Sequence, residues 1–306
     1  MKKLKINGHV FAAIAAVFLV FGMLGALVQY LGPTLRAGEE ELKQKPGESI
    51  NASVPAPSVS AEGAVLIDAD SGRVLYEKNA DKRLYPASTT KIMTALIALE
   101  TLEELGLGTD SKVIIPEEAA GVEGSSLYLK AGEKLTLEEL LYGLMLQSGN
   151  DSAEAVAICV GGTKEAFVAK MNERARQLGC AGTHFANPSG LYDDDHYTTA
   201  RDLSVIAAYA MKRADFRELV GAQSWKSHET DRSFVNKNKT VFNYEGGNGI
   251  KIGFTKKSGR TLVASAQRDG RELIAVVLRD GNWFNDAYAL MDYGFKVIEE
   301  ESKGEI

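Results

Sequence analysis

Cysteine is scarce in this sequence, since Cys159 and Cys180 are the only two among 306 residues. They form no C-x-x-C pair and no Cys/His cluster, so the sequence predicts no metal site. Cys159 lies in an apolar helical run, AEAVAICV, which favours a buried, unreactive thiol. Spacing alone does not decide whether the two cysteines form a disulfide.

Positive charge is not in excess either. The 35 Lys and Arg residues face 41 Asp and Glu, a net charge of −6, which gives no reason to expect nucleic acid as a partner. No G-x-S-x-G elbow is present, which argues against a Ser-His-Asp hydrolase. The stretch 193–196 (DDDH) is interpreted as a polar loop before a helix that Thr198 or Thr199 caps, rather than as a metal or triad site.

A single long apolar run stands at the N-terminus. Three lysines within the first five residues precede it, and residues 10–28 are almost entirely apolar. As a helix, this run would rise roughly 28 Å, close to the thickness of a bilayer core. Its length and the lack of a clean A-x-A site favour an uncleaved anchor over a cleaved signal peptide. The leading lysines place the rest of the chain outside the cytoplasm.

These features predict four segments. Residues 1–35 form the membrane anchor or signal segment, and the polar stretch 36–60, which contains three prolines, forms a flexible tether. A folded domain is expected over 61–298, followed by an acidic tail, 299–306. The tail is too short and acidic to bind a membrane, so tethering is expected through the N-terminal span.

The folded domain has strands at both ends and helices between them. Residues 63–80 predict a β-hairpin around Asp70, Ser71 and Gly72. Helical periodicity follows at 88–104, 136–147, 151–160, 164–178 and 200–212, with a possible strand at 113–116. Strand patterns return at 249–255, 260–268 and 271–280, before a last helix at 284–298. This order predicts an α+β fold with a mostly antiparallel sheet, flanking helices and an inserted helical lobe.

Ser88 and Lys91 lie three residues apart at the front of the first helix, in PASTTKIMTAL. Such residues share a helix face. If protein covers that face, burial lowers the pKa of the lysine, and the neutral amine can then take the serine proton. An S-x-x-K pair alone is weak evidence, because about one is expected by chance in a chain this long, and a cap followed by a solvated lysine is the ordinary alternative.

Two further motifs strengthen the catalytic interpretation. Ser148-Gly149-Asn150 falls where one helical pattern stops and the next begins, although such a junction is often only a loop and a helix cap. Lys251-Ile252-Gly253 lies on a predicted strand, where the glycine would allow close backbone approach. An edge strand that pairs with an extended peptide would use such a glycine.

Order, spacing and placement of the three motifs resemble those of the penicillin-binding serine transferases, whose motifs are S-x-x-K, S-x-N and K-T-G. The surrounding stretches narrow the resemblance to the low-molecular-mass D-alanyl-D-alanine carboxypeptidases. They include GAVLIDADSGRVLYEKNADKRLYPASTTKIMTALIALE, LMLQSGNDSAEAVA and HFANPSGLYDDDHYTTARDLSVIAAYAM. The likeness covers about 60–298 and implies a fold like that of penicillin-binding proteins and serine β-lactamases.

The resemblance also implies roles for individual residues. Ser88 would be the acyl-forming nucleophile and Lys91 its base. Ser148 would relay a proton to the departing amine. Asn150 would hold Lys91 and the substrate amide.

Substrate binding would rest on the segment 251–255. Lys251 would sustain the electrostatic field and help recognise the peptide end. Gly253 would admit the peptide backbone, and the N–H groups of Ser88 and Phe254 would form the oxyanion hole. No metal or other cofactor is implied.

Two positions depart from the family pattern. Ile252 stands where the family has threonine, which removes a hydroxyl expected to bind the substrate carboxylate. One such hydrogen bond is worth roughly 1.5–3 kcal/mol. Thr255 is a candidate replacement, because alternation puts it on the same side of the strand as Gly253. Trp283 stands where many relatives carry a basic residue, just before the last helix.

The resemblance implies a serine-type D-Ala-D-Ala carboxypeptidase, anchored in the cell membrane by one N-terminal span, or secreted if that segment is cleaved. Its partners would be peptidoglycan stem peptides as substrates and β-lactams as covalent inhibitors. The two altered positions keep open a DD-endopeptidase that cuts cross-links, and a catalytically weak peptidoglycan-binding or penicillin-sensing module. A β-lactamase is disfavoured because no E-x-x-L-N segment supplies a deacylating glutamate.

Overall fold

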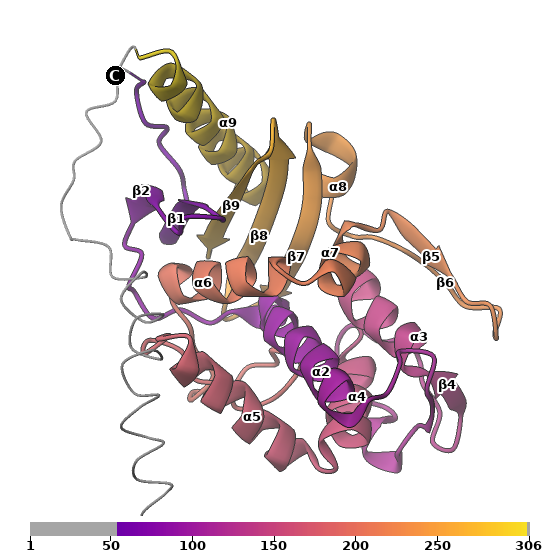
Figure 1. The fold of residues 1–306 in the computed structure, drawn as a ribbon. Coiled ribbons are helices and arrows are strands. Elements are labelled where there is room, and N and C mark those ends of the chain that lie inside the picture. Colours follow the sequence, from indigo (N-terminus) through magenta and orange to yellow (C-terminus); the bar gives the residue numbers. More distant parts are fainter. Residues whose placement is uncertain (1–53, 305–306) are drawn as a thin grey trace, which may run out of the picture. The chain divides into compact units, whose positions relative to one another are not determined.

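A computed structural model describes residues 54–304 of the chain (Figure 1). The predicted membrane span and most of the predicted tether lie outside these residues. Within the described part, no helix has both the length and the apolar character needed to cross a bilayer.

The centre of the described domain is an antiparallel sheet in the order β2-β1-β9-β8-β7. It joins the two ends of the domain, because β1 pairs with β9 along its whole length. Edge strands are β2 and β7. The strands are β1 (Gly63–Asp68), β2 (Val74–Lys78), β7 (Gly247–Thr255), β8 (Gly259–Arg268) and β9 (Arg271–Leu278).

Local sequence explains the tight β8–β9 connection. Asp269 and Gly270 both have positive φ angles, 50° and 76°. This is the backbone conformation that two-residue hairpin turns require, and Asp-Gly adopts it readily. The turn brings Arg268 opposite Arg271 and sets the register of the whole hairpin.

Helices cover both faces of the sheet (Figure 1). Helix α9 (Trp283–Ser302) packs on one face, and α6 (Ala200–Met211) and α7 (Ala214–Gly221) pack on the other. Side chains of β1 alternate accordingly: Ala64 and Leu66 join the cluster beneath α9, while Val65 and Ile67 join the larger cluster on the opposite face. Both faces of the sheet are therefore buried, because successive side chains along a strand point to opposite faces.

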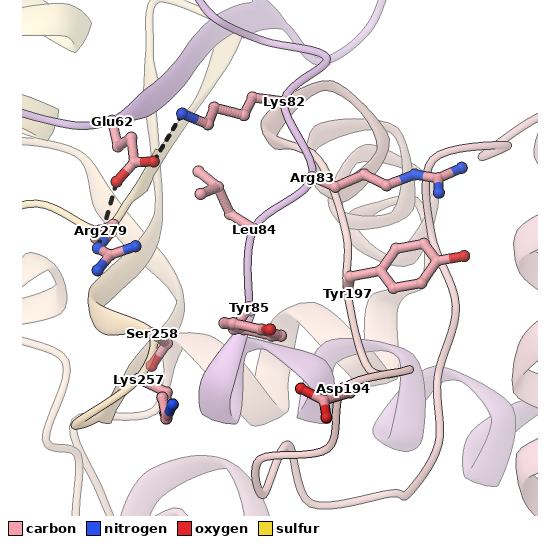
Figure 2. A pocket seen from close by; sticks show the side chains of 10 residues that line it. All are labelled: Glu62, Lys82, Arg83, Leu84, Tyr85, Asp194, Tyr197, Lys257, Ser258 and Arg279. Carbon is pink, nitrogen blue, oxygen red and sulfur yellow. Dashed lines mark ion pairs between the residues drawn. The ribbon is translucent and has the colours of Figure 1, made fainter.

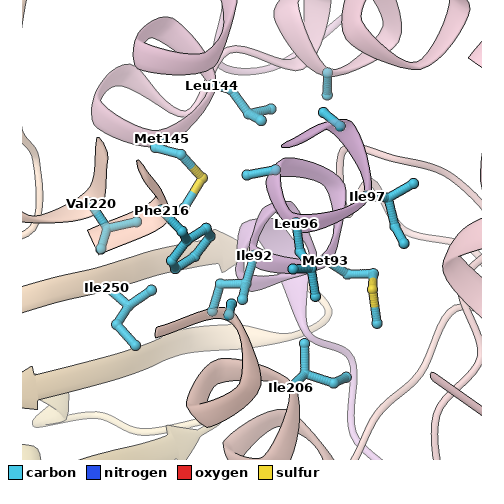
Figure 3. Close-up of a cluster of buried hydrophobic side chains, with 14 of the residues drawn as sticks. Ile92, Met93, Leu96, Ile97, Leu144, Met145, Ile206, Phe216, Val220 and Ile250 are labelled. Atoms are coloured by element: carbon cyan, nitrogen blue, oxygen red, sulfur yellow. The ribbon is translucent and has the colours of Figure 1, made fainter. Parts of the chain in front are cut away.

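The helical lobe is built around α2 (Lys91–Leu105), whose first nine residues are all buried. A helix that is apolar on every side needs protein on every side. Met93, Leu96 and Ile97 pack in the core that includes Leu144 and Phe216 (Figure 3). The other lobe elements are η2 (Ala87–Thr90), β3 (Lys112–Ile114), η3 (Glu117–Ala119), β4 (Lys134–Thr136), α3 (Leu137–Tyr142), η4 (Gly143–Gln147), α4 (Asn150–Gly161) and α5 (Lys164–Gln177).

The predicted α+β fold is confirmed, and so are the N-terminal hairpin, the helical lobe and the three C-terminal strands. The eight-residue helix α7 was missed in the sequence analysis. Also missed were five elements with too few residues to show a period: η3, β4, β5 (Ser224–Lys226), β6 (Ser233–Val235) and α8 (Thr240–Asn243). The predicted helix 136–147 divides into α3 and the π-helical η4. Helix α9 continues to Ser302, past its predicted end at 298.

Both cysteines are free thiols. Cys180 is buried, but Cys159 is only half-buried, so the prediction of a buried thiol is wrong for Cys159. Partial burial still raises the pKa of the Cys159 thiol, which keeps it protonated and weakly reactive.

Candidate active site

Ser88 and Lys91 lie at the start of the buried helix, with Ser88 in η2 and Lys91 as the first residue of α2. Lys91 Nζ lies 3.0 Å from Ser88 Oγ and donates to Asn150 Oδ1 at 2.7 Å and to the Ser189 carbonyl at 2.5 Å. The Lys91 side chain is fully buried. The lysine therefore faces the serine inside the protein and is not a solvated surface charge.

Three oxygens surround the Lys91 amine, a number that suits either protonation state. A neutral lysine amine has two N–H bonds and one lone pair, whereas an ammonium has three N–H bonds. If the amine is neutral, the oxygens of Asn150 and Ser189 can take its two N–H bonds, and its lone pair is then free for the Ser88 hydroxyl. In this state Lys91 can accept the serine proton.

Electrostatics favour that neutral state. Burial lowers the pKa of Lys91 well below its ordinary value, and the nearby charge of Lys251 lowers it further. Asp151 and Glu154 act in the opposite direction but are smaller causes. A lowered pKa increases the fraction of neutral amine, the form that general-base catalysis requires.

Ser189 is a partner of Lys91 that the sequence analysis did not single out. It belongs to the N-P-S-G turn at 187–190, where Asn187 Oδ1 accepts the backbone N–H groups of Ser189 and Gly190. A Cβ on Gly190 would lie only 1.9 Å from the Ala87 carbonyl oxygen, so only glycine fits against the segment that carries the nucleophile. The turn composition was visible in the sequence, but its contact with Lys91 was not.

The predicted Ser148-Gly149-Asn150 junction lies beside Lys91. Ser148 is buried, has a φ of 65° and ends η4, and Asn150 begins α4. Asn150 Nδ2 donates to the Glu123 carbonyl at 2.7 Å while its Oδ1 accepts from Lys91. The amide is thus oriented from both ends.

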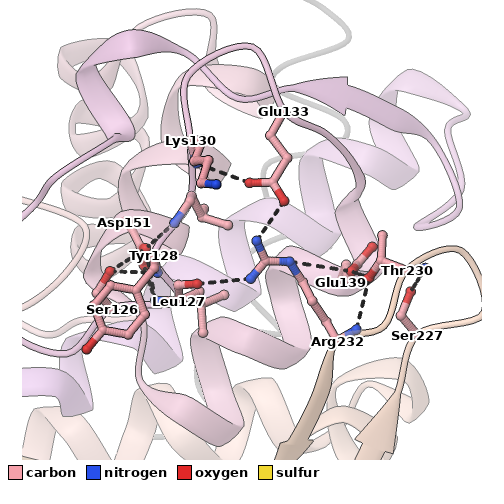
Figure 4. A network of polar contacts seen from close by, with 11 residues as sticks. Ser126, Leu127, Tyr128, Lys130, Glu133, Glu139, Asp151, Ser227, Thr230 and Arg232 are labelled. Carbon is pink, nitrogen blue, oxygen red and sulfur yellow. Dashed lines mark hydrogen bonds and ion pairs between the residues drawn. The ribbon is translucent and has the colours of Figure 1, made fainter.

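Asp151 holds the loop that covers this junction. Its fully buried carboxylate accepts the backbone N–H groups of Leu127 and Leu129, at 2.9 and 3.1 Å, and the Ser126 hydroxyl at 2.7 Å. Arg232 supports the same loop from the β5–β6 hairpin by donating to the Leu127 carbonyl at 2.9 Å (Figure 4). The network keeps 126–129 rigid next to Asn150, although no motif in the sequence marks it.

Lys251 is the second buried lysine, only 1 % exposed. Its Nζ donates to the carbonyl of the adjacent Ile252 at 3.2 Å. Burial and the charge of Lys237 lower the pKa of Lys251 to about 7. Lys237 itself donates to the Gln147 carbonyl at 2.9 Å, just before Ser148. Lys251, Lys237 and Ser148 therefore gather on one side of the site.

Gly253 lies against Ser88, the predicted nucleophile. A Cβ at this position would meet Thr261 Oγ1 at 2.4 Å and the Ser88 backbone nitrogen at 2.8 Å, which explains why glycine is needed here. The next residue, Phe254, is 63 % exposed on the edge strand. Gly253 is thus brought to the N–H group of Ser88, and the oxyanion hole shared by Ser88 and Phe254 stays a prediction.

Thr255 and Ile252 are engaged elsewhere. The Thr255 hydroxyl forms a hydrogen bond of 2.7 Å with Ser258 Oγ and accepts the Ser258 N–H, so it closes the β7–β8 turn. Ile252 is partly buried and packs against the cluster beneath α9. Neither side chain contacts Lys251 in place of the family's threonine hydroxyl.

His196 has a supporting position beneath the site, in the stretch interpreted above as a loop. It is buried, its Nδ1 accepts the Ala186 N–H at 3.1 Å, and its Nε2 lies 2.7 Å from Thr90 Oγ1, next to Lys91. Burial lowers the pKa of His196 to about 3, so the ring stays neutral. Thr199 caps α6, as predicted. Within residues 54–304, no group of three acidic, histidine or cysteine side chains is placed to hold a metal.

These contacts gather a buried amine with a lowered pKa, an amide and a second buried lysine around Ser88. Such an arrangement is suited to acyl transfer through a covalent serine intermediate. The fold and site therefore define the class of penicillin-binding serine enzymes. The individual roles assigned to the site residues stay predictions.

Comparisons with known proteins narrow the class. The sequence profile of the D-alanyl-D-alanine carboxypeptidase family matches residues 50–282. A D-alanyl-D-alanine carboxypeptidase of Bacillus subtilis is 40% identical over 211 residues, which cover 68% of this chain and 54% of that protein. One from a Streptomyces strain is 34% identical over 266 residues, which cover 80% of this chain and 90% of that protein.

Solved structures of related enzymes show the same likeness. The crystal structure of a Streptomyces DD-transpeptidase superposes with a TM-score of 0.75 at 34% identity, covering 79% of this chain and 100% of the other. A carboxypeptidase from Francisella tularensis also gives a TM-score of 0.75, at 29% identity, covering 83% of this chain and 74% of the other. The chain belongs to the D-alanyl-D-alanine carboxypeptidase family, and the resemblance found in the sequence is confirmed.

Proposed function

We propose that this protein removes the terminal D-alanine from peptidoglycan stem peptides through an acyl-enzyme on Ser88. One observation carries the proposal: the Lys91 amine is fully buried, has a lowered pKa and lies 3.0 Å from Ser88 Oγ. Family membership supports the choice of substrate.

The reaction follows from the site in two halves. Lys91 takes the Ser88 proton as Oγ attacks the carbonyl between the two D-alanines, and the N–H groups of Ser88 and Phe254 stabilise the oxyanion. The C–N bond then breaks, Ser148 relays a proton to the departing amine, and free D-alanine leaves. Water next attacks the ester carbonyl and the C–Oγ bond breaks. Ser88 Oγ regains a proton, and the shortened peptide leaves with a new terminal carboxylate.

A β-lactam would enter the same first half. Its ring amide is opened by Ser88, but the amine formed stays attached to the acyl group and blocks water. We therefore propose β-lactams as covalent inhibitors at Ser88. The family membership that supports the peptide substrate supports these inhibitors equally.

We also propose that the apolar segment 10–28 anchors the protein in the cell membrane, with the catalytic domain outside the cytoplasm. Support for this comes only from the sequence, from the length of the apolar run and the lysines before it. Peptidoglycan lies on that side of the membrane, which makes the proposed location consistent with the substrate.

The test uses the full-length protein, its Ser88→Ala variant, and monomeric pentapeptide or cross-linked muropeptides. We expect release of free D-alanine from the pentapeptide and a penicilloyl mass adduct, both absent in Ser88→Ala. Cleavage of the cross-linked substrate alone would identify a DD-endopeptidase. A stable adduct with no cleavage of either substrate would identify a penicillin-sensing module.

A further inference from the structure

The backbone at Ser148 has a shape that its own sequence does not favour. Ser148 has a φ of 65° and a ψ of 32°, in the left-handed region that residues with a Cβ rarely adopt. Such a conformation persists only where the surrounding structure fixes it. The direction of the Ser148 hydroxyl therefore depends on the segments packed around the 148–150 junction.

Leu127 is the side chain packed most closely beside this junction. A Cβ on Gly143 would lie 2.1 Å from Leu127 Cδ1, and a Cβ on Gly149 would lie 2.9 Å from Leu127 Cγ. Gly143 begins η4, Gly149 follows Ser148, and the Gly149 N–H donates to the Gly143 carbonyl at 3.2 Å. Leu127 thus packs against both glycines between which Ser148 lies.

Arg232, directly before β6, holds the backbone of Leu127. Its Nη1 donates to the Leu127 carbonyl at 2.9 Å and its Nη2 donates to Glu133 Oε1 at 2.7 Å, while its Nε lies 3.9 Å from Glu139 Oε1 (Figure 4). A guanidinium is planar and its N–H groups form a rigid fork, so these contacts fix its position and orientation together. Asp151 accepts the Leu127 N–H at 2.9 Å, so Leu127 is held at both of its peptide groups.

The segment that carries Arg232 also contacts the other side of the junction. Gln147 Nε2 donates to the Val235 carbonyl at 2.7 Å, and the Lys237 N–H donates to the Leu146 carbonyl at 3.1 Å. Gln147 directly precedes Ser148. One stretch of chain, 232–237, therefore supports both the loop beside the junction and the residue before Ser148.

The position of Ser148 matters for one step of the proposed reaction. The proton that Lys91 takes from Ser88 passes through the Ser148 hydroxyl to the departing nitrogen. Such a transfer needs donor and acceptor within about 2.6–3.2 Å of each other. A small rotation of the Ser148 backbone would lengthen this contact without moving Ser88 or Lys91, so it would slow protonation of the leaving group more than attack by Ser88.

We propose that Arg232 is a positioning residue for this proton transfer, an inference that rests on the proposed peptidase function. By holding Leu127 against Gly143 and Gly149, Arg232 keeps the Ser148 hydroxyl directed at the departing nitrogen. Arg232 acts through Leu127 and not on the substrate itself.

The test compares two substrates that share one acyl part. The first is an acetylated tripeptide that ends in two D-alanines, and the second is its thioester analogue, in which sulfur replaces the nitrogen of the last residue. A thiol has an ordinary pKa of about 8.5, so a thiolate leaves without a proton, whereas an amide nitrogen must be protonated as it leaves. The ratio of kcat/KM for the amide to kcat/KM for the thioester, measured with the full-length protein, therefore reports the proton transfer. Changes in acyl binding or in the active fraction cancel in this ratio.

We expect Arg232→Gln to lower the amide/thioester ratio about tenfold and to change kcat/KM for the thioester less than about twofold. Ser148→Ala should lower the ratio about 100-fold. Adding Arg232→Gln to Ser148→Ala should not lower the ratio further, because both residues act on the same step. A merely structural role for Arg232 would slow both substrates alike and leave the ratio unchanged.

Two other arginines serve as controls. Arg213 matches Arg232 in burial, with 23% of its side chain exposed against 21%, and it also pairs with two acids, Glu103 and Asp215. Arg83 lines a separate pocket beside the nucleophile segment (Figure 2), so its removal tests whether loss of a nearby positive charge alters the ratio. Arg213→Gln and Arg83→Gln should both keep the ratio of the wild type.

Further variants guard against a failure to fold. Glu139 is only 1 % exposed, so Arg232→Gln leaves a buried carboxylate without a nearby cation and can unfold the lobe. Arg232→Lys keeps the charge but not the planar fork, and Leu127→Ala keeps Arg232 but removes the contact with the two glycines. Both should lower the ratio in the same direction as Arg232→Gln.

The outcomes separate this role from the proposed reaction. An unchanged ratio in the folded Arg232 variants, or a further drop when Arg232→Gln is added to Ser148→Ala, overturns the positioning role and leaves the peptidase standing. If the wild type releases no D-alanine, the peptidase is overturned and hydrogen exchange at the Gly149 and Asn150 amides decides the positioning role. These amides donate to the carbonyls of Gly143 and Ser125. Faster exchange in Arg232→Gln than in Arg213→Gln supports the role, and equal exchange overturns it.

Discussion

Lys91 and Lys251 are two buried lysines whose charges oppose each other across the site: burial first, and the charge of Lys251 second, lower the pKa of Lys91. The two have different requirements. In the proposed reaction, Lys91 must be neutral to take the Ser88 proton, and Lys251 must be charged to attract the carboxylate of the substrate. The pair therefore makes the proposed activity dependent on pH from both sides.

We expect a bell-shaped pH profile for kcat/KM of D-alanine release. The rate rises as the lowered pKa of Lys91 is passed, and it falls as Lys251 loses its proton near its pKa of about 7. In Lys251→Arg the guanidinium stays protonated, so the alkaline fall should move above about pH 9. A fall near pH 7 that persists in Lys251→Arg would assign the alkaline limb to another group.

Gly253→Ala should slow acylation of Ser88 by a penicillin about 100-fold, because the new Cβ would lie 2.8 Å from the Ser88 nitrogen and displace an oxyanion donor. Intact-mass spectrometry over time gives the rate. Gly281→Ala is the matched control, since its Cβ would have no heavy atom within 4 Å, and its acylation rate should equal that of the wild type. Equal rates in the two variants would show that Gly253 is not needed at the oxyanion site.

Asp151→Asn should lower the free energy of unfolding by about 2–4 kcal/mol. The buried carboxylate accepts hydrogen bonds from Ser126, Leu127 and Leu129, and an amide cannot accept all of them. Urea denaturation measures the loss, and hydrogen exchange at the Leu127 and Leu129 amides should accelerate. Asp231→Asn, in the exposed β5–β6 connection, should change neither. Unchanged exchange in Asp151→Asn would mean that the loop is held by other contacts.

Ile252→Thr should raise kcat/KM for the pentapeptide about 10-fold. A threonine hydroxyl beside Lys251 restores a hydrogen bond to a carboxylate, and the Thr255 hydroxyl is occupied by Ser258 and does not replace it. Ile252→Val keeps the branched shape without the hydroxyl and should show no gain. A similar rate in all three proteins would mean that the substrate carboxylate is bound elsewhere.

Much of this architecture was predictable because its signals are local. The hairpin at 63–80 and the long helices follow from periodicity within one segment, and Asp269-Gly270 specifies its turn through backbone conformation alone. The three short motifs could be recognised for the same reason, since each is a few adjacent residues. Elements such as β5, β6 and α8 carry too few residues for any period to emerge.

By itself, the sequence determined which residues could act: a serine and a lysine on one helix face, an amide at a helix start and a lysine beside a glycine on a strand. Only the tertiary structure decided that Lys91 is buried and oriented. The oxygens that accept hydrogen bonds from its amine belong to Asn150, 59 residues away, and Ser189, 98 residues away. The type of each side chain follows directly from the sequence. The exclusion of water from a lysine, and the lowered pKa that results, arise only when distant segments pack around that lysine.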